Sequence, residues 1–428
     1  MVSDPERTTY DVCIIGAGMS GMAAALCAAN RGLSTIQAGG ASELLFASGL
    51  LDLLGVHPIE KKKIWRDPWA GIDALIRDIP QHPYARIEKE LIQSAFDELL
   101  VFLGAAGVEY KHHKRRNQEV VTSMGTSKLT YCLPLTMWKG AMALKKKTPG
   151  LIVDFQGLKG FSARQICETL AHRWPNVSAA RAEIPGLPSF NEVYTERIAR
   201  ALEVVENREK LARSIRPHLK NAEIVGLPAI LGINRSGEIM ADLERRIGVP
   251  LFEIPTMPPS VPGLRLKEAF EQHLPLKGVD LISHQQVLRA RYERRGFFVL
   301  DIGDAQKKLS IRSRAVVLAT GRFIGQGLRA DRLEIRETLF NLPVHQPATR
   351  EHWHLKDFLD PKGHPINRAG LEIDDYFRPL DKAGKRAFPT LFAAGSILAH
   401  QDWIRMKCGS GLAIASAYAA MRSLLKLI

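Results

Sequence analysis

Three features of the sequence predict an α/β fold of two domains, in which a Rossmann-type nucleotide-binding domain is built from both ends of the chain. The first is a glycine turn between an apolar strand and an alanine-rich helix, in the N-terminal stretch YDVCIIGAGMSGMAAALCAANRG. The second is a pair of late strand exits with small residues, VVLATG and LFAAGS. The third is the length of 428 residues, which exceeds what one hydrophobic core usually supports. The middle of the chain is therefore expected to form an inserted cap domain.

The N-terminal turn carries the G-x-G-x-x-G pattern in Gly16, Gly18 and Gly21. In this pattern the first glycine permits a tight turn, the second lets the backbone approach a phosphate, and the third lets the helix pack closely on the strand. The helix that begins near Met19 and Ser20 then points its free N–H groups at the phosphate. A bound nucleotide is therefore expected at this turn.

The second strand, at about residues 33–37, lacks a residue that this fold usually has. An Asp or Glu roughly 20 residues beyond the turn normally binds the adenosine ribose of a dinucleotide. Here the strand ends in Gln-Ala-Gly-Gly, and Gln37 stands where the acid is expected. The turn therefore predicts a nucleotide but leaves open which one.

Later stretches have the same small-residue character: two strand exits and a glycine turn that opens the last helix. We expect them to join the first turn in one site, which is the order of a two-domain flavoprotein whose cap closes over the isoalloxazine. The positive end of the last helix would then stabilise the anion of a reduced flavin. The residues concerned are Thr320, Gly321, Gly395, Ser396, Gly409, Ser410 and Gly411.

The expected domain boundaries follow from this order. Residues 1–105 and 301–428 are predicted to form the flavin-binding domain, and residues 106–300 the inserted cap or substrate domain. From about residue 285, three alternating segments predict a small antiparallel layer.

Composition limits the other possibilities. No apolar run reaches the roughly 18 residues of a membrane-spanning helix, and the N-terminus does not resemble a signal peptide, so a cytoplasmic protein is expected. The five cysteines form no C-x-x-C pair, so their spacing predicts no metal or iron–sulfur site. The net charge of +14 fits either solvated lysines or a surface for an anionic partner. No recognition motif for nucleic acid accompanies it.

Six motifs together resemble the B subunit of anaerobic glycerol-3-phosphate dehydrogenase. They are IIGAGMSGM, FASGLLDLLG, HPY, PTMPPSVPGLRL, VVLATGRFIGQGL and LFAAGSIL, and they run from the first strand almost to the last helix. The second and fourth are far more specific than the glycine turn. We add Ser48 and Gly49 of FASGLLDLLG to the expected cofactor-binding residues.

The resemblance implies a flavoprotein that works in a complex. Its partners would be an FAD-containing A subunit, together with an iron–sulfur C subunit, which attaches the complex to the inner face of the cell membrane. The complex oxidises sn-glycerol 3-phosphate to dihydroxyacetone phosphate and passes the electrons to quinone. The family is associated with FMN, which has one phosphate and no adenosine, so the missing ribose acid fits FMN. FAD stays as the alternative, because Gln37 can still hydrogen-bond a ribose hydroxyl.

The sequence departs from the usual pattern of this family at two positions. Ser410 interrupts a glycine run that is usually denser, and Arg322 follows Gly321 where a small residue is more usual.

A self-sufficient FAD enzyme of the fumarate-reductase or succinate-dehydrogenase type is the main alternative. Its anion-binding and proton-transfer candidates would be Arg265, Arg322, His345 and Arg378, although each also fits a structural or surface role. The third hypothesis is a flavin-free docking scaffold, which the intact glycine turn disfavours. The sequence identifies no catalytic residue beyond these candidates.

Overall fold

The structure is a computed structural model, and it describes residues 9–40, 43–184, 192–304 and 308–427. The chain divides into two compact units. Unit 1 contains residues 1–43, 52–99 and 270–428, and unit 2 contains residues 44–51 and 100–269. Unit 1 is thus formed from both ends of the chain.

The boundaries differ from the expected ones at two places. The second long boundary lies at residues 269–270 instead of 300, because the strands after residue 278 pair with the sheet of unit 1. The short segment 44–51 belongs to unit 2, although it lies inside the range assigned to the flavin-binding domain.

The described part of unit 1 is built on a seven-stranded sheet with the order β11-β2-β1-β14-β13-β12, and β17 also pairs with β14. The neighbours of β1 and β2 are parallel, whereas β12, β13 and β14 form an antiparallel meander. The long β14 pairs with β13 up to Ser313 and with β17 from Val316. The strands are β1 (Thr9–Ile15), β2 (Thr35–Gly39), β11 (Val279–Ser283), β12 (Gln286–Tyr292), β13 (Phe298–Gly303), β14 (Lys308–Leu318) and β17 (Leu391–Ala393).

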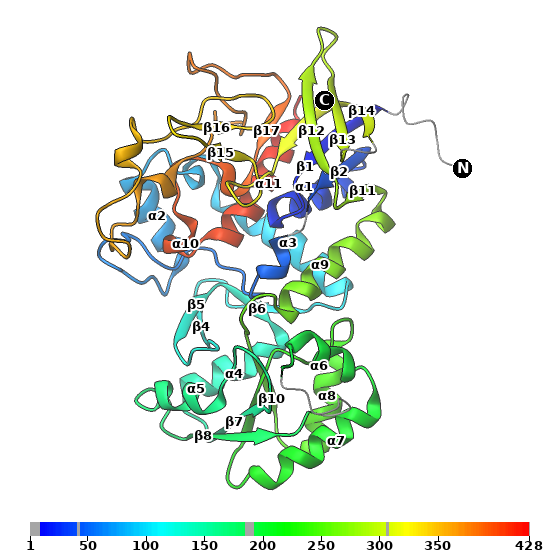
Figure 1. Cartoon of the computed structure of the whole chain (residues 1–428), viewed down its shortest axis with the longest axis vertical. Helices are drawn as coiled ribbons and strands as arrows, with labels where there is room; N and C mark the ends of the chain where they lie inside the picture. Colours follow the sequence, from blue (N-terminus) through cyan, green and yellow to red (C-terminus); the bar gives the residue numbers. More distant parts are fainter. Residues whose placement is uncertain (1–8, 41–42, 185–191, 305–307, 428) are drawn as a thin grey trace. The chain divides into compact units, whose positions relative to one another are not determined.

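Helices α1 and α11 pack against each other in unit 1 (Figure 1). Both are rich in alanine, and most of their residues are buried, so small side chains let the helices approach each other and the sheet. The helices of this unit are α1 (Met19–Ala29), α2 (Pro68–Asp78), α10 (Trp403–Met406) and α11 (Gly409–Leu424), and β15 (Leu328–Ala330) and β16 (Ile335–Glu337) form a separate hairpin. Two helices contain unit boundaries, α3 (Lys89–Ala105) and α9 (Val261–His273).

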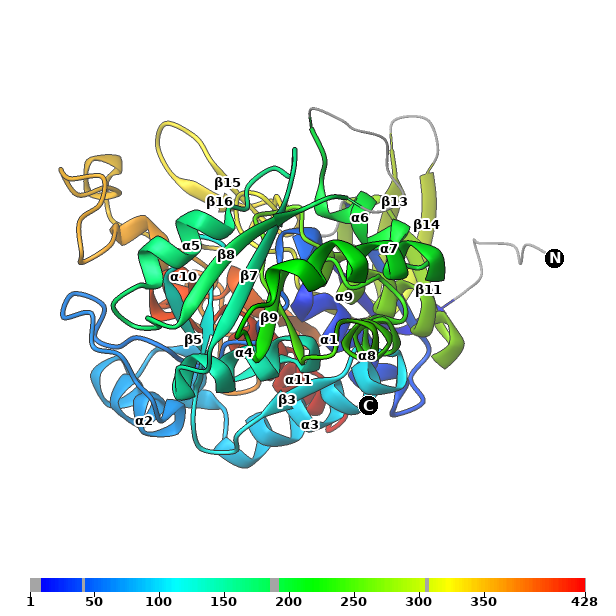
Figure 2. The same ribbon diagram turned by 90° about the horizontal axis from the view of Figure 1, so that it is seen from below.

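Unit 2 has a parallel four-stranded sheet with the order β10-β9-β7-β8. Strands β7, β9 and β10 are buried throughout, as expected for a parallel sheet covered by helices. Helices α7 and α8 lie side by side (Figure 2). The strands are β7 (Gly150–Phe155), β8 (Val177–Ala182), β9 (Ile224–Pro228) and β10 (Leu251–Ile254), with the small pairs β3 (Tyr110–His112) with β6 (Cys132–Pro134) and β4 (Gln118–Val121) with β5 (Ser127–Thr130). The helices are α4 (Leu135–Lys146), α5 (Ala163–Leu170), α6 (Thr195–Ala201), α7 (Val205–Ile215) and α8 (Ser236–Ile247).

Candidate nucleotide-binding site

The glycine turn after β1 is fixed by two close backbone contacts. Gly16 has a φ of +133°, and a Cβ at this position would lie 2.1 Å from the carbonyl oxygen of Ala319, just beyond β14. A Cβ on Gly21 would lie 2.0 Å from the carbonyl oxygen of Gly16. Both positions therefore require glycine, the first for its dihedral angle and the strand exit beside it, and the second for the approach of α1.

Gly18 faces open space. It is the N-terminal cap of α1, has ordinary extended dihedral angles, and has no heavy atom within 4 Å of the position that its Cβ would take. No acidic residue lies in the first turn of the helix, which begins at Met19. Open space before the N–H groups of a helix's first turn is a setting in which phosphate groups bind.

The end of β2 is closed to a ribose-binding side chain. A Cβ on Gly39 would lie 2.6 Å from the backbone nitrogen of Ala17. Gln37 is buried, and its amide donates a hydrogen bond of 2.6 Å to the carbonyl oxygen of Gly16. The side chain of Gln37 therefore supports the turn from inside, and its hydrogen bond to a ribose hydroxyl stays a prediction.

The late strand exits lie beside the glycine turn, where the sequence predicts them. Gly395 has a φ of +80°, and its Cβ would lie 2.4 Å from Ser20 Oγ. The Gly395 amide donates to Ser416 Oγ of α11 at 2.8 Å. Thr320, which follows Ala319, has an Oγ1 that is buried and lacks a hydrogen-bond partner among the described residues. Buried polar groups are usually hydrogen-bonded, so this hydroxyl is a candidate for contact with a ligand.

The beginning of α11 is partly covered by the chain itself. The amide of Gly411 donates to the carbonyl oxygen of Asp52 at 2.7 Å, and the amide of Asp52 donates to Ser410 Oγ at 2.6 Å. Tyr84 Oη donates to the carbonyl of Leu53 at 2.9 Å and holds the same segment. One first-turn amide and the Ser410 hydroxyl are thus engaged within unit 1, which reduces what this helix end offers to a flavin.

Ser48 and Gly49 lie in unit 2, apart from the other expected cofactor-binding residues in the division of the chain. Gly49 has a φ of +78°, and its carbonyl oxygen accepts a hydrogen bond of 2.7 Å from Tyr110 Oη. A Cβ there would lie 2.6 Å from Pro262 Cβ. Within unit 2 the glycine of this motif therefore serves close packing against the PTMPPSVPGLRL segment.

Arg322 donates hydrogen bonds to the backbone. Its guanidinium donates to the carbonyl oxygens of Ser396, Asn367, Leu398 and Gln401. Burial lowers its pKa to about 10. Ser396 contributes its carbonyl to this arrangement, so the arginine ties together the loop that follows β17.

Arg265 and Arg378 are committed to carboxylates. In unit 2, Arg265 Nη1 and Nη2 donate to the two oxygens of Glu253 at 2.6 and 2.8 Å, and both side chains are buried. Burial alone would raise the pKa of Glu253, but the charge and hydrogen bonds of Arg265 outweigh it and lower that pKa. Arg378 pairs with Asp374 at 2.7 Å. Because each guanidinium is already paired with a carboxylate, neither arginine offers an unpaired positive charge to a substrate anion.

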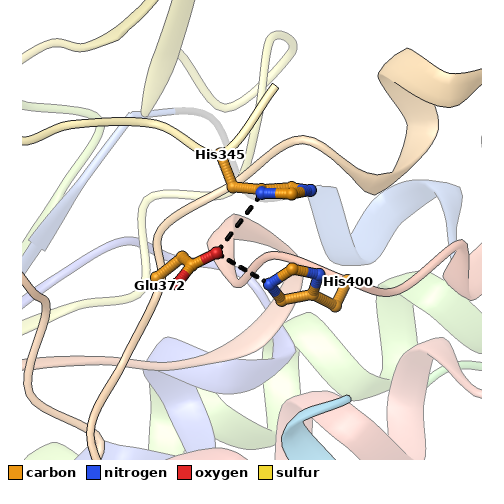
Figure 3. Close-up of side chains that lie close together, drawn as sticks. All are labelled: His345, Glu372 and His400. Atoms are coloured by element: carbon orange, nitrogen blue, oxygen red, sulfur yellow. Dashed lines mark hydrogen bonds and ion pairs between the residues drawn. The ribbon is translucent and has the colours of Figure 1, made fainter. Parts of the chain in front are cut away.

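His345 lies with Glu372 and His400 (Figure 3). Its Nδ1 is 3.3 Å from Glu372 Oε1. Burial and the neighbouring His345 lower the pKa of His400. Sequence reasoning found only one member of this cluster, since the other two carry no motif.

Unit 2 contains a cavity of about 300 Å³. Its wall combines apolar side chains with charged groups, including Tyr110, Trp138, Lys139, Met240 and Glu244. Lys139 pairs with Glu244, and Lys111 Nζ lies 5.0 Å from the Trp138 ring centroid. Sequence patterns did not indicate this cavity, because its residues come from four separate segments.

The glycine turn and the neighbouring strand exits are those of a Rossmann-type nucleotide-binding protein. Residues 11–412 match the family model of the FAD binding domain, so the chain belongs to the FAD-binding domain family. The predicted flavoprotein fold and flavin-dependent oxidoreductase class are thereby confirmed. None of the helices within the described ranges is both long and apolar enough to cross a membrane.

The curated relatives are named as the B subunit of anaerobic glycerol-3-phosphate dehydrogenase, which confirms the resemblance seen in the motifs. The protein from Aliivibrio fischeri (strain ATCC 700601 / ES114) is 29% identical over 97% of this chain and 95% of its own length. That from Vibrio vulnificus (strain YJ016) is 27% identical over 96% and 95%. The Pectobacterium carotovorum protein is 27% identical over 97% and 99%.

Solved structures give a weaker likeness. The 3-ketosteroid delta1-dehydrogenase from Sterolibacterium denitrificans aligns with a TM-score of 0.45 at 10% identity, covering 98% of this chain and 100% of the other. A flavocytochrome c3 fumarate reductase aligns with a TM-score of 0.42 at 9% identity, covering 98% and 78%. Scores this low carry no conclusion about activity.

Proposed function

We propose that this chain is the flavin-dependent B subunit of an anaerobic glycerol-3-phosphate dehydrogenase complex. The complex would oxidise sn-glycerol 3-phosphate to dihydroxyacetone phosphate and pass the electrons to quinone. The observation that carries the proposal is the full-length match to relatives of that name, at 27–29% identity. The intact glycine turn and the strand exits beside it support retention of the flavin.

We propose FMN as the flavin. Three observations at the end of β2 favour a mononucleotide: no acid stands at positions 37–40, a side chain at Gly39 would collide with Ala17, and Gln37 is engaged by Gly16. The family description names FAD, which remains the competing assignment. Mass spectrometry of the flavin released from purified protein distinguishes the two.

A bound flavin would supply the two-electron redox chemistry, and the chain would hold and shield it. The first-turn amides of α1 and Gly18 would bind the phosphate. Thr320 Oγ1, which is buried without a hydrogen-bond partner among the described residues, would donate or accept one hydrogen bond with the bound nucleotide. The N-terminal end of α11 would add a positive potential at the flavin. The Gly411 amide would contribute less to it, because it already donates to the carbonyl oxygen of Asp52.

The self-sufficient fumarate-reductase-type enzyme is disfavoured by the candidate arginines. Such an enzyme needs free cationic groups to bind a small dicarboxylate. Arg265 and Arg378 are paired with acids, and Arg322 is saturated by carbonyl oxygens. Turnover assays of the isolated chain with an artificial acceptor test the point: fumarate reduction or succinate oxidation would favour the alternative.

We propose that the partners are an FAD-containing A subunit, together with an iron–sulfur C subunit, and that the complex lies at the inner face of the cell membrane. The basic clusters at residues 61–63, 111–116 and 145–147 support contact with anionic headgroups or an acidic partner. Co-purification from the native host, followed by identification of the bound chains, tests this assembly. Release from membranes by salt tests the role of charge, since roughly 1 M salt shortens the Debye length to about 3 Å.

A further inference from the structure

Three side chains from separate segments of unit 1 converge on one point outside the nucleotide turn (Figure 3). Glu372 Oε1 lies 3.3 Å from His345 Nδ1 and 3.0 Å from His400 Nε2. The three atoms that would serve as ligands all lie within 4.8 Å of one another, and the imidazole centroids are 4.2 Å apart. The same carboxylate oxygen therefore faces both rings.

These separations suit the coordination shell of a small divalent cation. A tetrahedral ion with bonds of about 2.0–2.1 Å holds neighbouring ligand atoms about 3.3 Å apart. The two distances from Glu372 Oε1 already match this value, so modest rotation of the side chains would bring the three ligands to one ion. Two imidazole nitrogens and one carboxylate oxygen are a donor set that zinc and related transition metals prefer.

The backbone holds the three segments in register. The amide of His345 donates to the carbonyl of Gly370 at 2.8 Å, and the amide of Gly370 donates back at 3.1 Å. The amide of Ala399 donates to the carbonyl of Leu371 at 3.0 Å, which fixes the third segment beside the second. His400 itself has a φ of +62°, a left-handed conformation that a non-glycine residue seldom adopts and that recurs at functional sites.

The cluster is open to solvent on one side. The side chains of His345 and Glu372 are 42% and 48% exposed, whereas that of His400 is 19% exposed. A cavity of about 20 Å³ beside Glu372 and His400 has room for water. Arg86 also lines this cavity, and its charge is offset by Asp375 at 3.7 Å.

We propose that His345, Glu372 and His400 bind a divalent transition metal of the zinc class, with three protein ligands and water in the remaining position. The site contains none of the residues of the glycine turn. Metal binding can be measured directly in protein that retains its flavin, so failure of this proposal is distinguishable from failure of the proposed dehydrogenase activity.

The test is metal titration of the full chain after treatment with a chelator. Calorimetry with Zn²⁺ should give one ion per chain in the wild type. His345→Gln, Glu372→Gln and His400→Asn should each weaken affinity by more than the roughly 10–100-fold lost with an outer-shell partner. Asparagine is chosen at position 400 because it tolerates the left-handed region. The exposed residues His172 and Glu351 supply matched controls, His172→Asn and Glu351→Gln, which should bind as the wild type does.

Flavin content and the thermal midpoint establish that each variant is folded. A second measurement needs no variant: Co²⁺ bound to two imidazoles and a carboxylate at low coordination number absorbs visible light far more strongly than hydrated Co²⁺. Saturable binding with that spectrum supports the site. A spectrum of hydrated Co²⁺ alone, or Zn²⁺ affinity unchanged in folded ligand variants, would overturn it.

Discussion

Substitution of Gly18 by valine separates phosphate binding from folding. No heavy atom lies within 4 Å of the position of a Cβ at Gly18, and its dihedral angles suit any residue. The protein itself therefore accommodates the side chain, and the main folding cost is a poorer helix cap, about 0.5–1 kcal/mol. The phosphate does not accommodate it, because the side chain would occupy the space that the phosphate needs.

The expected loss of affinity follows from the hydrogen bonds to the phosphate. Each bond from a helix amide to a charged oxygen contributes roughly 1.5 kcal/mol at the low end. Loss of two such bonds costs about 3 kcal/mol, which corresponds to a roughly hundredfold weaker binding of the flavin. Purified Gly18→Val should therefore contain little flavin while its circular dichroism and thermal midpoint, compared as apoproteins, stay close to those of the wild type.

Gly104→Val is the matched control, since Gly104 also has open space around its Cβ position and lies in helix α3. It should keep the flavin content and reconstitution affinity of the wild type. The measurement is titration of apoprotein with FMN, followed by absorbance or calorimetry. Wild-type affinity in Gly18→Val would refute the assignment of the phosphate to this turn.

Four further variants test other parts of the account. Arg265→Met should lower the free energy of unfolding by about 3–5 kcal/mol, because it leaves Glu253 charged and buried, and Glu253→Gln in the same chain should restore part of it in denaturant titrations. Arg322→Met should remove the arginine donor from the carbonyls of Asn367 and Gln401, at about 1–3 kcal/mol each, and lower both the thermal midpoint and flavin content. Gly395→Ala should cost more than the roughly 1–2 kcal/mol of left-handed strain, since its Cβ also meets a neighbouring side chain. Burial lowers the pKa of His82 to about 3, whereas a histidine in the unfolded chain has a pKa of about 6.5. Unfolding therefore takes up a proton below about pH 6.5, and the free energy of unfolding falls as the pH decreases, by up to about 1.4 kcal/mol per pH unit. His82→Asn should flatten this slope.

The two arginine expectations each have a contrary outcome. Equal destabilisation by the single and double variants of the Arg265 pair would show that the uncompensated charge is not the cause. A thermal midpoint unchanged in Arg322→Met would remove the loop-tying role of that side chain. For His82→Asn, the comparison is made between pH 5 and 6.5, above the range where most carboxylates titrate. Asparagine retains an oxygen that can accept from the Tyr84 amide, as His82 Nδ1 does at 3.1 Å.

The nucleotide site could be predicted from local sequence patterns. Gly16, Gly18 and Gly21 indicate a strand–turn–helix because their roles depend on backbone geometry within six residues. The exits at Thr320 and Gly395 were predictable because the carboxyl ends of parallel strands meet at one edge of a sheet. Local periodicity indicated these elements, and the general rule for parallel sheets brought them together.

Long-range pairing explains what the sequence did not reveal. The boundary near residue 270 depends on β11 adding to the edge of β2, a partner more than 200 residues away. The sequence does not show that Arg265 pairs with Glu253, or that the Gln37 amide donates to the carbonyl oxygen of Gly16, because the fold brings these partners together. The metal cluster has no spacing signal at all, since its members stand 27 and 28 residues apart, at 345, 372 and 400.

The identity of the released cofactor tests the central claim most directly. The full chain is purified under conditions that retain flavin, its visible spectrum is recorded, and the denatured supernatant is analysed by mass spectrometry. We predict a flavin spectrum and release of FMN, close to one per chain, without covalent attachment. Release of FAD would contradict the mononucleotide assignment drawn from Gly39 and Gln37. A colourless protein that also fails to bind added FMN or FAD would contradict the claim that the glycine turn holds a flavin.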